Sequence, residues 1–132
     1  MEENNKGRLY SIDLPSPKLL SSGKEPGWVV PVHLRKRWDL RFGTSSELLP
    51  SLLEEVKIVD IFLHDSEHSY ENMYWEYTTA WRYIRKGGLL LSHDIHLNSA
   101  FRDFARRVSE KYCYTLGNTA GIKRTKDSIT SA

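Results

Sequence analysis

The chain has 132 residues, of which 39% are hydrophobic and 27% are charged, and its formal net charge is +2. A small charge scattered along the chain argues against a nucleic-acid partner, and the single cysteine excludes an internal disulfide and a cysteine-based metal site. No apolar run approaches the roughly 18 residues of a membrane span, and the first residues lack the pattern of a signal peptide. We therefore expect one cytoplasmic domain, residues 1–132, that does not bind a membrane.

Two short strands, separated by a long irregular stretch, come first in chain order. The strand 8–12 ends on Asp13, and a second strand, 38–42, alternates apolar and polar residues before Gly43. Residues 15–37 hold four of the five prolines together with several apolar side chains. This composition predicts a packed loop between the two strands.

The middle of the chain alternates helices with a strand. Residues 44–46 offer N-caps to a helix whose apolar positions are Leu48, Leu49, Leu52, Leu53 and Val56. A buried strand is predicted over 58–63. Ser69 caps the next helix, which we expect to end at a C-cap on Gly87. The apolar face of that helix carries Met73, Tyr77, Ala80, Trp81 and Ile84.

The last third of the chain continues this alternation. A strand over 88–92 precedes a helix whose buried face carries Phe101, Phe104, Ala105, Val108 and Tyr112. Two β segments near 113–116 and 119–124 form a hairpin, in which Cys113 is expected to be a small buried side chain. Residues 126–132 are expected to form a disordered tail. Alternating strands and helices predict an α/β fold with a largely parallel sheet.

Charged and imidazole side chains gather where the strands 58–63 and 88–92 end. They are His64, Asp65, Glu67, His68, His93 and Asp94. Because ligands of α/β sheets bind at the carboxyl ends of parallel strands, these side chains are expected to converge on one crevice. Such oxygen and nitrogen donors suit divalent ions such as Mg, Mn, Fe or Zn, which places at least Asp65 and Asp94 in a common pocket. His64 is expected to be a packing residue instead.

Two patterns typical of metal hydrolases occur outside their usual context. Residues 64–68 fit H-x-x-E-H, and His93-Asp94 is the pair found in His-Asp phosphohydrolases. Both patterns belong on helices, whereas here each follows an apolar strand. At the end of the first strand, Asp13 has two interpretations of about equal weight: an acceptor for ribose hydroxyls, or a turn residue before Pro15.

Four stretches of the chain carry a resemblance to a known family. They are 10–15, 37–40 with 43–45, 62–73 (FLHDSEHSYENM) and 87–95 (GGLLLSHDI), in that order. In these stretches the chain resembles class I S-adenosylmethionine-dependent methyltransferases of the methyltransferase domain 24 type. The resemblance implies a Rossmann-like, mostly parallel sheet with flanking helices and a C-terminal β hairpin.

The resemblance also implies residues that bind the cofactor, S-adenosylmethionine. Asp13 would hold the ribose at the end of its strand. Gly43, Thr44 and Ser45 would form the loop beside the adenine. Asp65 would lie near the methionine moiety and the methyl group that is transferred.

By the same resemblance, Asp65, His93 and Asp94 would bind a divalent metal such as Mg or Mn. His68 would be the base that deprotonates an acceptor hydroxyl, since histidine titrates near neutral pH. The implied activity is O-methylation of a small-molecule hydroxyl, with the metal lowering the pKa of that hydroxyl.

One part of the family pattern is absent from the sequence. Such enzymes begin with a strand and a Gly-rich turn that holds the cofactor, and only residues 1–7 precede the strand 8–12. The chain is therefore interpreted as an N-terminally truncated domain in which the strands 8–12 and 58–63 pair with each other or with another chain. Two alternatives stay open: a non-catalytic methyltransferase-like interaction module that forms a homo-oligomer, and a metal-dependent hydrolase or oxygenase.

Overall fold

A computed structural model describes residues 6–16 and 24–125. The chain forms two compact units that divide between Leu49 and Pro50. In this part of the chain, no helix is long and apolar enough to cross a bilayer. The predicted tail, 126–132, lies outside the described residues.

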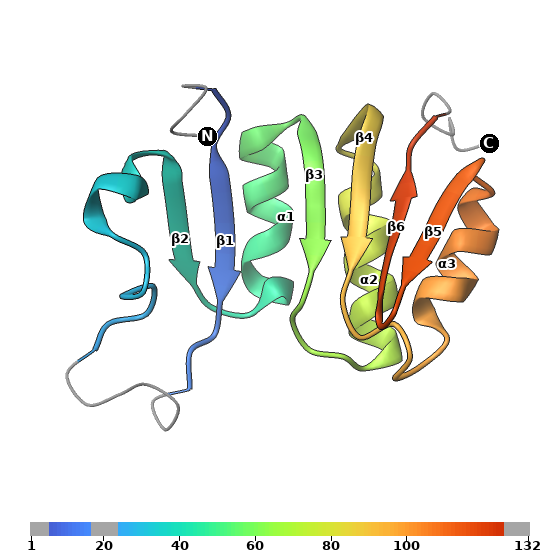
Figure 1. The fold of residues 1–132 in the computed structure, drawn as a ribbon, viewed down its shortest axis with the longest axis horizontal. Helices are drawn as coiled ribbons and strands as arrows, with labels where there is room; N and C mark the ends of the chain where they lie inside the picture. The colour runs from blue at the N-terminus through green and yellow to red at the C-terminus, as the bar shows by residue number, and fades with distance from the viewer. Residues whose placement is uncertain (1–5, 17–23, 126–132) are drawn as a thin grey trace. The chain divides into compact units, whose positions relative to one another are not determined.

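The first unit contains two parallel strands, β1 (Leu9–Asp13) and β2 (Trp38–Phe42) (Figure 1). Their last residues, Asp13 and Phe42, are paired, and the backbone N–H of Gly43 donates to the Asp13 carbonyl at 3.0 Å. Both predicted strands are therefore present, and both end at the same edge of their sheet.

The segment between these strands is more regular than a loop in its second half. Residues Val32–Arg37 form a 3-10 helix, and the Arg35 side chain donates to the carbonyls of Val30 and Gly27 at 2.8 and 3.1 Å. These bonds satisfy backbone acceptors that a loop would leave to water. Residues 17–23 of the predicted loop lie outside the described residues.

Helix α1 (Ser45–Val56) begins with a capping box. The backbone N–H of Glu47 donates to Thr44 Oγ1 at 3.3 Å, and the backbone N–H of Thr44 donates to Glu47 Oε2 at 3.1 Å. The hydroxyl of Thr44 also donates to that carboxylate, and these bonds lower the pKa of Glu47. The predicted helix is thus confirmed, with Thr44 as the cap that starts it.

The second unit is a four-stranded sheet with two helices. Its strand order is β3-β4-β6-β5, in which β3 and β4 are parallel and the other two pairs are antiparallel. The bounds are β3 Val59–His64, α2 Tyr70–Trp81, β4 Ile84–Ser92, α3 Ala100–Val108, β5 Tyr112–Leu116 and β6 Thr119–Lys123. This α/β arrangement and the C-terminal hairpin confirm the predicted fold class (Figure 1).

The core of this unit lies between the sheet and the helices α2 and α3. Its buried members are Met73, Tyr77, Trp81, Ile84, Leu90, Ala100, Phe101, Phe104, Val108, Ala120 and Ile122. The spacing of the helical members follows the 3.6-residue period, as the sequence predicts. Ser69 is the N-cap of α2, and its hydroxyl accepts from the backbone N–H of Asn72.

Helix α2 is shorter than predicted, because the residues after it join the sheet. The helix ends at Trp81, and the backbone N–H of Val59 already donates to the Tyr83 carbonyl. Gly87 is therefore not a helix C-cap. It has a positive φ of 82° inside β4, where the register with β3 shifts, and this conformation favours glycine.

Two further predictions need correction. Tyr112 opens β5 instead of lying on the buried face of α3, and Cys113 is exposed in that strand. Among the described residues, the hydrogen-bonded strands form two sheets, with β1 in one and β3 in the other, and pairing with another chain stays a prediction.

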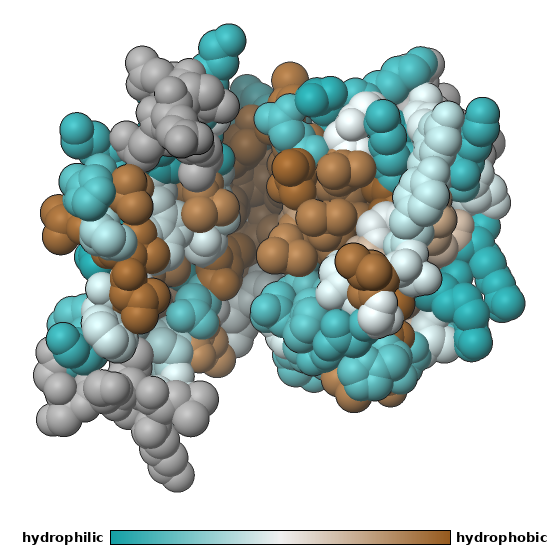
Figure 2. Space-filling view, viewed as in Figure 1, coloured by the Kyte–Doolittle hydropathy of each residue, from teal (hydrophilic) through white to brown (hydrophobic). Residues whose placement is uncertain are grey.

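Only one face of β3 is buried. Ile61 and Leu63 are 59% and 58% exposed. His64, whose side chain points to the opposite face of the strand, is only 1% exposed and faces the core. Figure 2 shows apolar side chains gathered on the viewed face over β3 and β4. The apolar run over 58–63 therefore reflects one exposed apolar face and not burial on both sides.

Tyr77 makes the stability of this core sensitive to alkaline pH. Burial raises the pKa of Tyr77 to about 12 from 10.0, although its hydroxyl bonds Ser92 Oγ at 2.6 Å. The folded state thus holds the Tyr77 proton more tightly than the unfolded state. The contribution of this protonated hydroxyl to the unfolding free energy is complete below pH 10 and is lost as pH rises toward about 12.

We expect the wild type to lose about 2–3 kcal/mol more unfolding free energy than Tyr77→Phe between about pH 9 and pH 12. Urea unfolding of both proteins at these pH values measures the difference. Equal losses in the two proteins would contradict the assignment, because the exposed tyrosines are common to both.

Candidate functional site

Two parallel strands deliver the candidate residues to one edge of the sheet. β3 and β4 end in register, with His64 paired to Ser92, and the backbone N–H of His93 donates to the His64 carbonyl at 3.0 Å. Asp65 and His93 directly follow β3 and β4, so they leave the sheet side by side. The predicted convergence of the two strand ends is confirmed.

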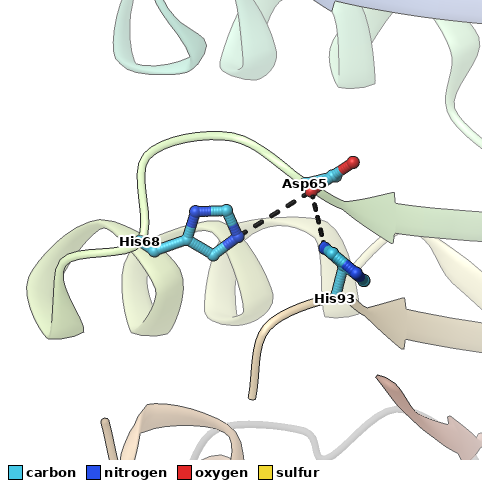
Figure 3. A group of neighbouring side chains, drawn as sticks. All are labelled: Asp65, His68 and His93. Atoms are coloured by element: carbon cyan, nitrogen blue, oxygen red, sulfur yellow. Dashed lines mark hydrogen bonds and ion pairs between the residues drawn. The ribbon is translucent and has the colours of Figure 1, made fainter. Parts of the chain in front are cut away.

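Asp65, His68 and His93 point toward one another beyond these strands (Figure 3). Asp65 Oδ1 lies 3.2 Å from His93 Nδ1 and 3.8 Å from His68 Nε2. One ligand atom from each of the three side chains lies within 4.8 Å of the other two, a spacing that could hold a metal ion. His68 Nε2 is buried and has no hydrogen-bond partner among the described residues.

Asp94 joins this group through an unusual backbone conformation. Its φ is +51°, a left-handed value that aspartate tolerates better than most residues. Asp94 Oδ2 lies 3.5 Å from His93 Nδ1 and 3.8 Å from His68 Nε2. Consecutive strand residues would point to opposite faces, and the left-handed turn lets His93 and Asp94 point to the same place. Such strain is concentrated at functional sites.

The loop between β3 and α2 is fixed by a buried carboxylate. Glu76 is 2% exposed, and its Oε2 lies 2.7 Å from His64 Nδ1. Its Oε1 accepts from Ser66 Oγ at 2.6 Å and from Asn72 Nδ2 at 3.1 Å. His64 is therefore a buried packing residue, as predicted, and the bonds hold the chain on both sides of Asp65.

Glu67 does not join the cluster. Glu67 is exposed, and its backbone carbonyl accepts a hydrogen bond from Asn72 Nδ2 at 3.0 Å. The H-x-x-E-H pattern therefore has no metal-protease geometry here, because its first histidine is buried against Glu76 and its glutamate lies outside.

Two contributors to the site were missed in the sequence. Glu76 lies on the apolar face of α2 beside Met73 and Tyr77, and a charged residue on a buried face is a signal that it has a partner. Asn118, at the tip of the β5–β6 hairpin, donates through Nδ2 to Asp94 Oδ1 at 2.8 Å and lies 3.1 Å from His93 Nε2. Its sequence context indicated a turn and nothing more.

The first unit holds the other residues assigned to the cofactor. Asp13 is exposed at the end of β1, and its carbonyl accepts from Gly43. A Cβ on Gly43 would lie 2.8 Å from Leu48 Cδ1, so close packing of α1 favours glycine at this position. The side chain of Thr44 caps α1, while Ser45 is the first residue of the helix.

Comparison with protein families matches residues 1–95 to a family described as "Methyltransferase domain". The chain belongs to this methyltransferase family. A search of curated proteins found no match. The region matched includes both strand ends and the residues Asp65, His68, His93 and Asp94, whereas Asn118 lies beyond it.

Three solved structures with a similar fold are methyltransferases by name. One is the MycE methyltransferase from the mycinamycin biosynthetic pathway in complex with Mg, SAH and mycinamycin VI, with 13% identity, a TM-score of 0.66, and coverage of 96% of this chain and 38% of that chain. Another is the O-methyltransferase NovP, with 14% identity, a TM-score of 0.62, and coverage of 94% and 63%.

A third structure is the apo form of CalS11, a TDP-rhamnose 3'-O-methyltransferase in calicheamicin biosynthesis. It has 16% identity, a TM-score of 0.54, and coverage of 69% of this chain and 44% of that chain. At these identities the similarity establishes the fold. The chain spans less than two thirds of the length of each of these three proteins.

Proposed function

We propose that this chain is part of an S-adenosylmethionine-dependent methyltransferase that methylates a hydroxyl group of a small molecule. The observation that carries the proposal is the convergence of His68, His93, Asp65 and Asp94 at the carboxyl ends of β3 and β4 in a chain of the methyltransferase family. The ends of parallel strands are the usual ligand edge of such sheets. The structural neighbours MycE, NovP and CalS11 act on small molecules or are O-methyltransferases by name, which supports this substrate class.

The donor set fits a divalent ion. Asp65 Oδ1, His93 Nδ1 and Asp94 Oδ2 would hold it, since His93 Nδ1 is 3.2 and 3.5 Å from the two carboxylate oxygens. When bound, S-adenosylmethionine supplies an electrophilic methyl group, and a divalent ion lowers the pKa of a neighbouring hydroxyl. MycE was solved with Mg and SAH, which supports both groups as partners.

His68 would take the proton of the acceptor hydroxyl. Its Nε2 lies 3.8 Å from the carboxylates of both Asp65 and Asp94, and it has no hydrogen-bond partner among the described residues. An imidazole nitrogen without a hydrogen-bond partner can accept a proton from a hydroxyl within reach. The backbone of His68 is held in place by the Asn98 side chain, which donates to its carbonyl at 2.9 Å.

Asp13 would accept hydrogen bonds from the ribose hydroxyls, with Gly43, Thr44 and Ser45 beside the adenine. The exposed position of Asp13 at the end of a parallel strand supports this role. Asp65 would contact the methionine moiety of the cofactor from the end of β3.

Calorimetric titration with S-adenosylmethionine tests the proposal. We expect binding by the wild type and at least about ten-fold weaker binding by Asp13→Ala, since a charged hydrogen bond contributes about 1.5–3 kcal/mol. Asp60→Ala is the matched control, because Asp60 pairs with Arg85 near the opposite end of β3. An absence of cofactor binding by the wild type would contradict the proposal and favour a non-catalytic module.

A further inference from the structure

The cluster at the ends of β3 and β4 has an imidazole between its two carboxylates. His93 Nδ1 lies 3.2 Å from Asp65 Oδ1 and 3.5 Å from Asp94 Oδ2. Metal bonds of about 2.0–2.2 Å place neighbouring ligand atoms about 3–3.6 Å apart in octahedral or tetrahedral geometry. His93 Nδ1 is therefore at ligand spacing from both carboxylates, and Asp65, His68 and His93 offer ligand atoms that lie within 4.8 Å of one another.

The type of donor decides which ion such a site prefers. Mg²⁺ is held by oxygen ligands, whereas an imidazole nitrogen favours Zn²⁺, Fe²⁺, Co²⁺ or Ni²⁺. We propose that the site binds a divalent transition-metal ion in preference to Mg²⁺, with His93 Nδ1 as the ligand that sets this preference. The inference rests on the metal site proposed above, and it differs from the Mg present in the MycE structure.

Asn118 is a positioning residue for two of the three ligands. Its amide nitrogen lies 3.1 Å from His93 Nε2 and 2.8 Å from Asp94 Oδ1. The other polar atoms of these two side chains, His93 Nδ1 and Asp94 Oδ2, are the ones that face the cluster. With Nε2 engaged by Asn118, Nδ1 is the ring nitrogen that faces the carboxylates. The same Nδ2 donates to Asp94 Oδ1, so Nε2 accepts from it in this structure and the ring proton is on Nδ1. Metal binding at Nδ1 would need that proton on Nε2, with the amide reversed so that its oxygen accepts from Nε2–H and its bond to Asp94 is given up.

The hairpin that carries Asn118 is anchored to the same loop. The backbone N–H of Ile95 donates to the Asn118 carbonyl at 3.0 Å. The side chain of Asn118 is thus held beside His93 and Asp94 by the chain segment that follows them. Partners of metal ligands at this position change metal affinity by about 10–100-fold when they are removed.

Competition titrations with ZnCl₂ and MgCl₂ on the full chain test the preference. Zn²⁺ binds most nitrogen and oxygen sites more tightly than Mg²⁺, so the informative quantity is the change in the Zn²⁺/Mg²⁺ affinity ratio between variants. We expect His93→Asp to lower this ratio by at least about ten-fold, because an oxygen ligand replaces the imidazole. His33→Asp, the same substitution at an exposed histidine, should leave the ratio unchanged.

We expect Asn118→Ala to weaken Zn²⁺ binding by about 10–100-fold. The visible absorption of bound Co²⁺, which reports its ligands, should change in His93→Asp. Circular dichroism without metal verifies that each variant is folded. An unchanged affinity ratio in folded His93→Asp, or full Zn²⁺ affinity in Asn118→Ala, would overturn the inference.

These outcomes are separate from those of the cofactor titration. Metal preference without S-adenosylmethionine binding would retain this inference and reject the proposed function. If the chain binds S-adenosylmethionine but its metal affinity does not depend on His93, the proposed function is retained and this inference is rejected.

Discussion

Replacing His68 by glutamine is expected to lower the rate of methyl transfer to a hydroxyl acceptor by about 100-fold or more, the scale of general-base catalysis. Glutamine can donate and accept hydrogen bonds, but its amide does not take up a proton near neutral pH. The free Nε2 of His68, 3.8 Å from Asp65 and Asp94, is the only part of the cluster that we assign to proton transfer.

Release of S-adenosylhomocysteine at saturating acceptor measures this rate, and calorimetry measures cofactor binding by the same variant. We expect cofactor binding to be unchanged, so the loss would lie in the chemical step. His33→Gln, at an exposed histidine of the 3-10 helix, is the matched control. A wild-type rate in His68→Gln would reject the assignment of this base.

The second large effect is expected at Glu76. Glu76→Ala should lower the unfolding free energy by about 3 kcal/mol or more, because removing one partner of a buried pair leaves the other uncompensated. His64 would lose its 2.7 Å partner while remaining buried, and the Ser66 and Asn72 bonds to Oε1 would be lost as well.

Urea unfolding of Glu76→Ala, Glu76→Gln and Glu71→Ala separates these contributions. Glu76→Gln keeps an acceptor for His64 and should lose less than Glu76→Ala. Glu71 is exposed in the first turn of α2, where the interaction of a glutamate with the helix dipole stabilises the helix by only about 0.3–1 kcal/mol. Equal effects of Glu76→Ala and Glu71→Ala would show that the buried pair does not stabilise the loop.

Local patterns were sufficient to predict most elements. The caps Thr44 and Ser69 and the periodic apolar positions after them predict α1 and α2 from interactions within a few residues. The predicted end of α2 was wrong, because Tyr83 and Ile84 fit the period of a helix as well as that of a strand. Their pairing with Val59, which is distant in sequence, decided that they belong to the sheet.

The candidate site was predicted in outline from the strand ends. Two apolar runs followed by His-Asp pairs were enough to expect that Asp65, His93 and Asp94 converge, since parallel strands end at one edge. Asn118 could not be found this way. It reaches the site through the return of an antiparallel hairpin, and no local pattern records which side chain a hairpin tip will place against a strand end.

The sequence by itself determined the alternation of strands and helices, the apolar face of each helix, and the family, because these depend on neighbouring residues and on motifs. Only the tertiary structure decided which atoms meet. The left-handed φ of Asp94, the pairing of Glu76 with His64 and the position of Asn118 all depend on segments far apart in the chain. Geometry of this kind follows from packing and strand register. It brings two charged strand ends together into one cluster, with His68 beside it.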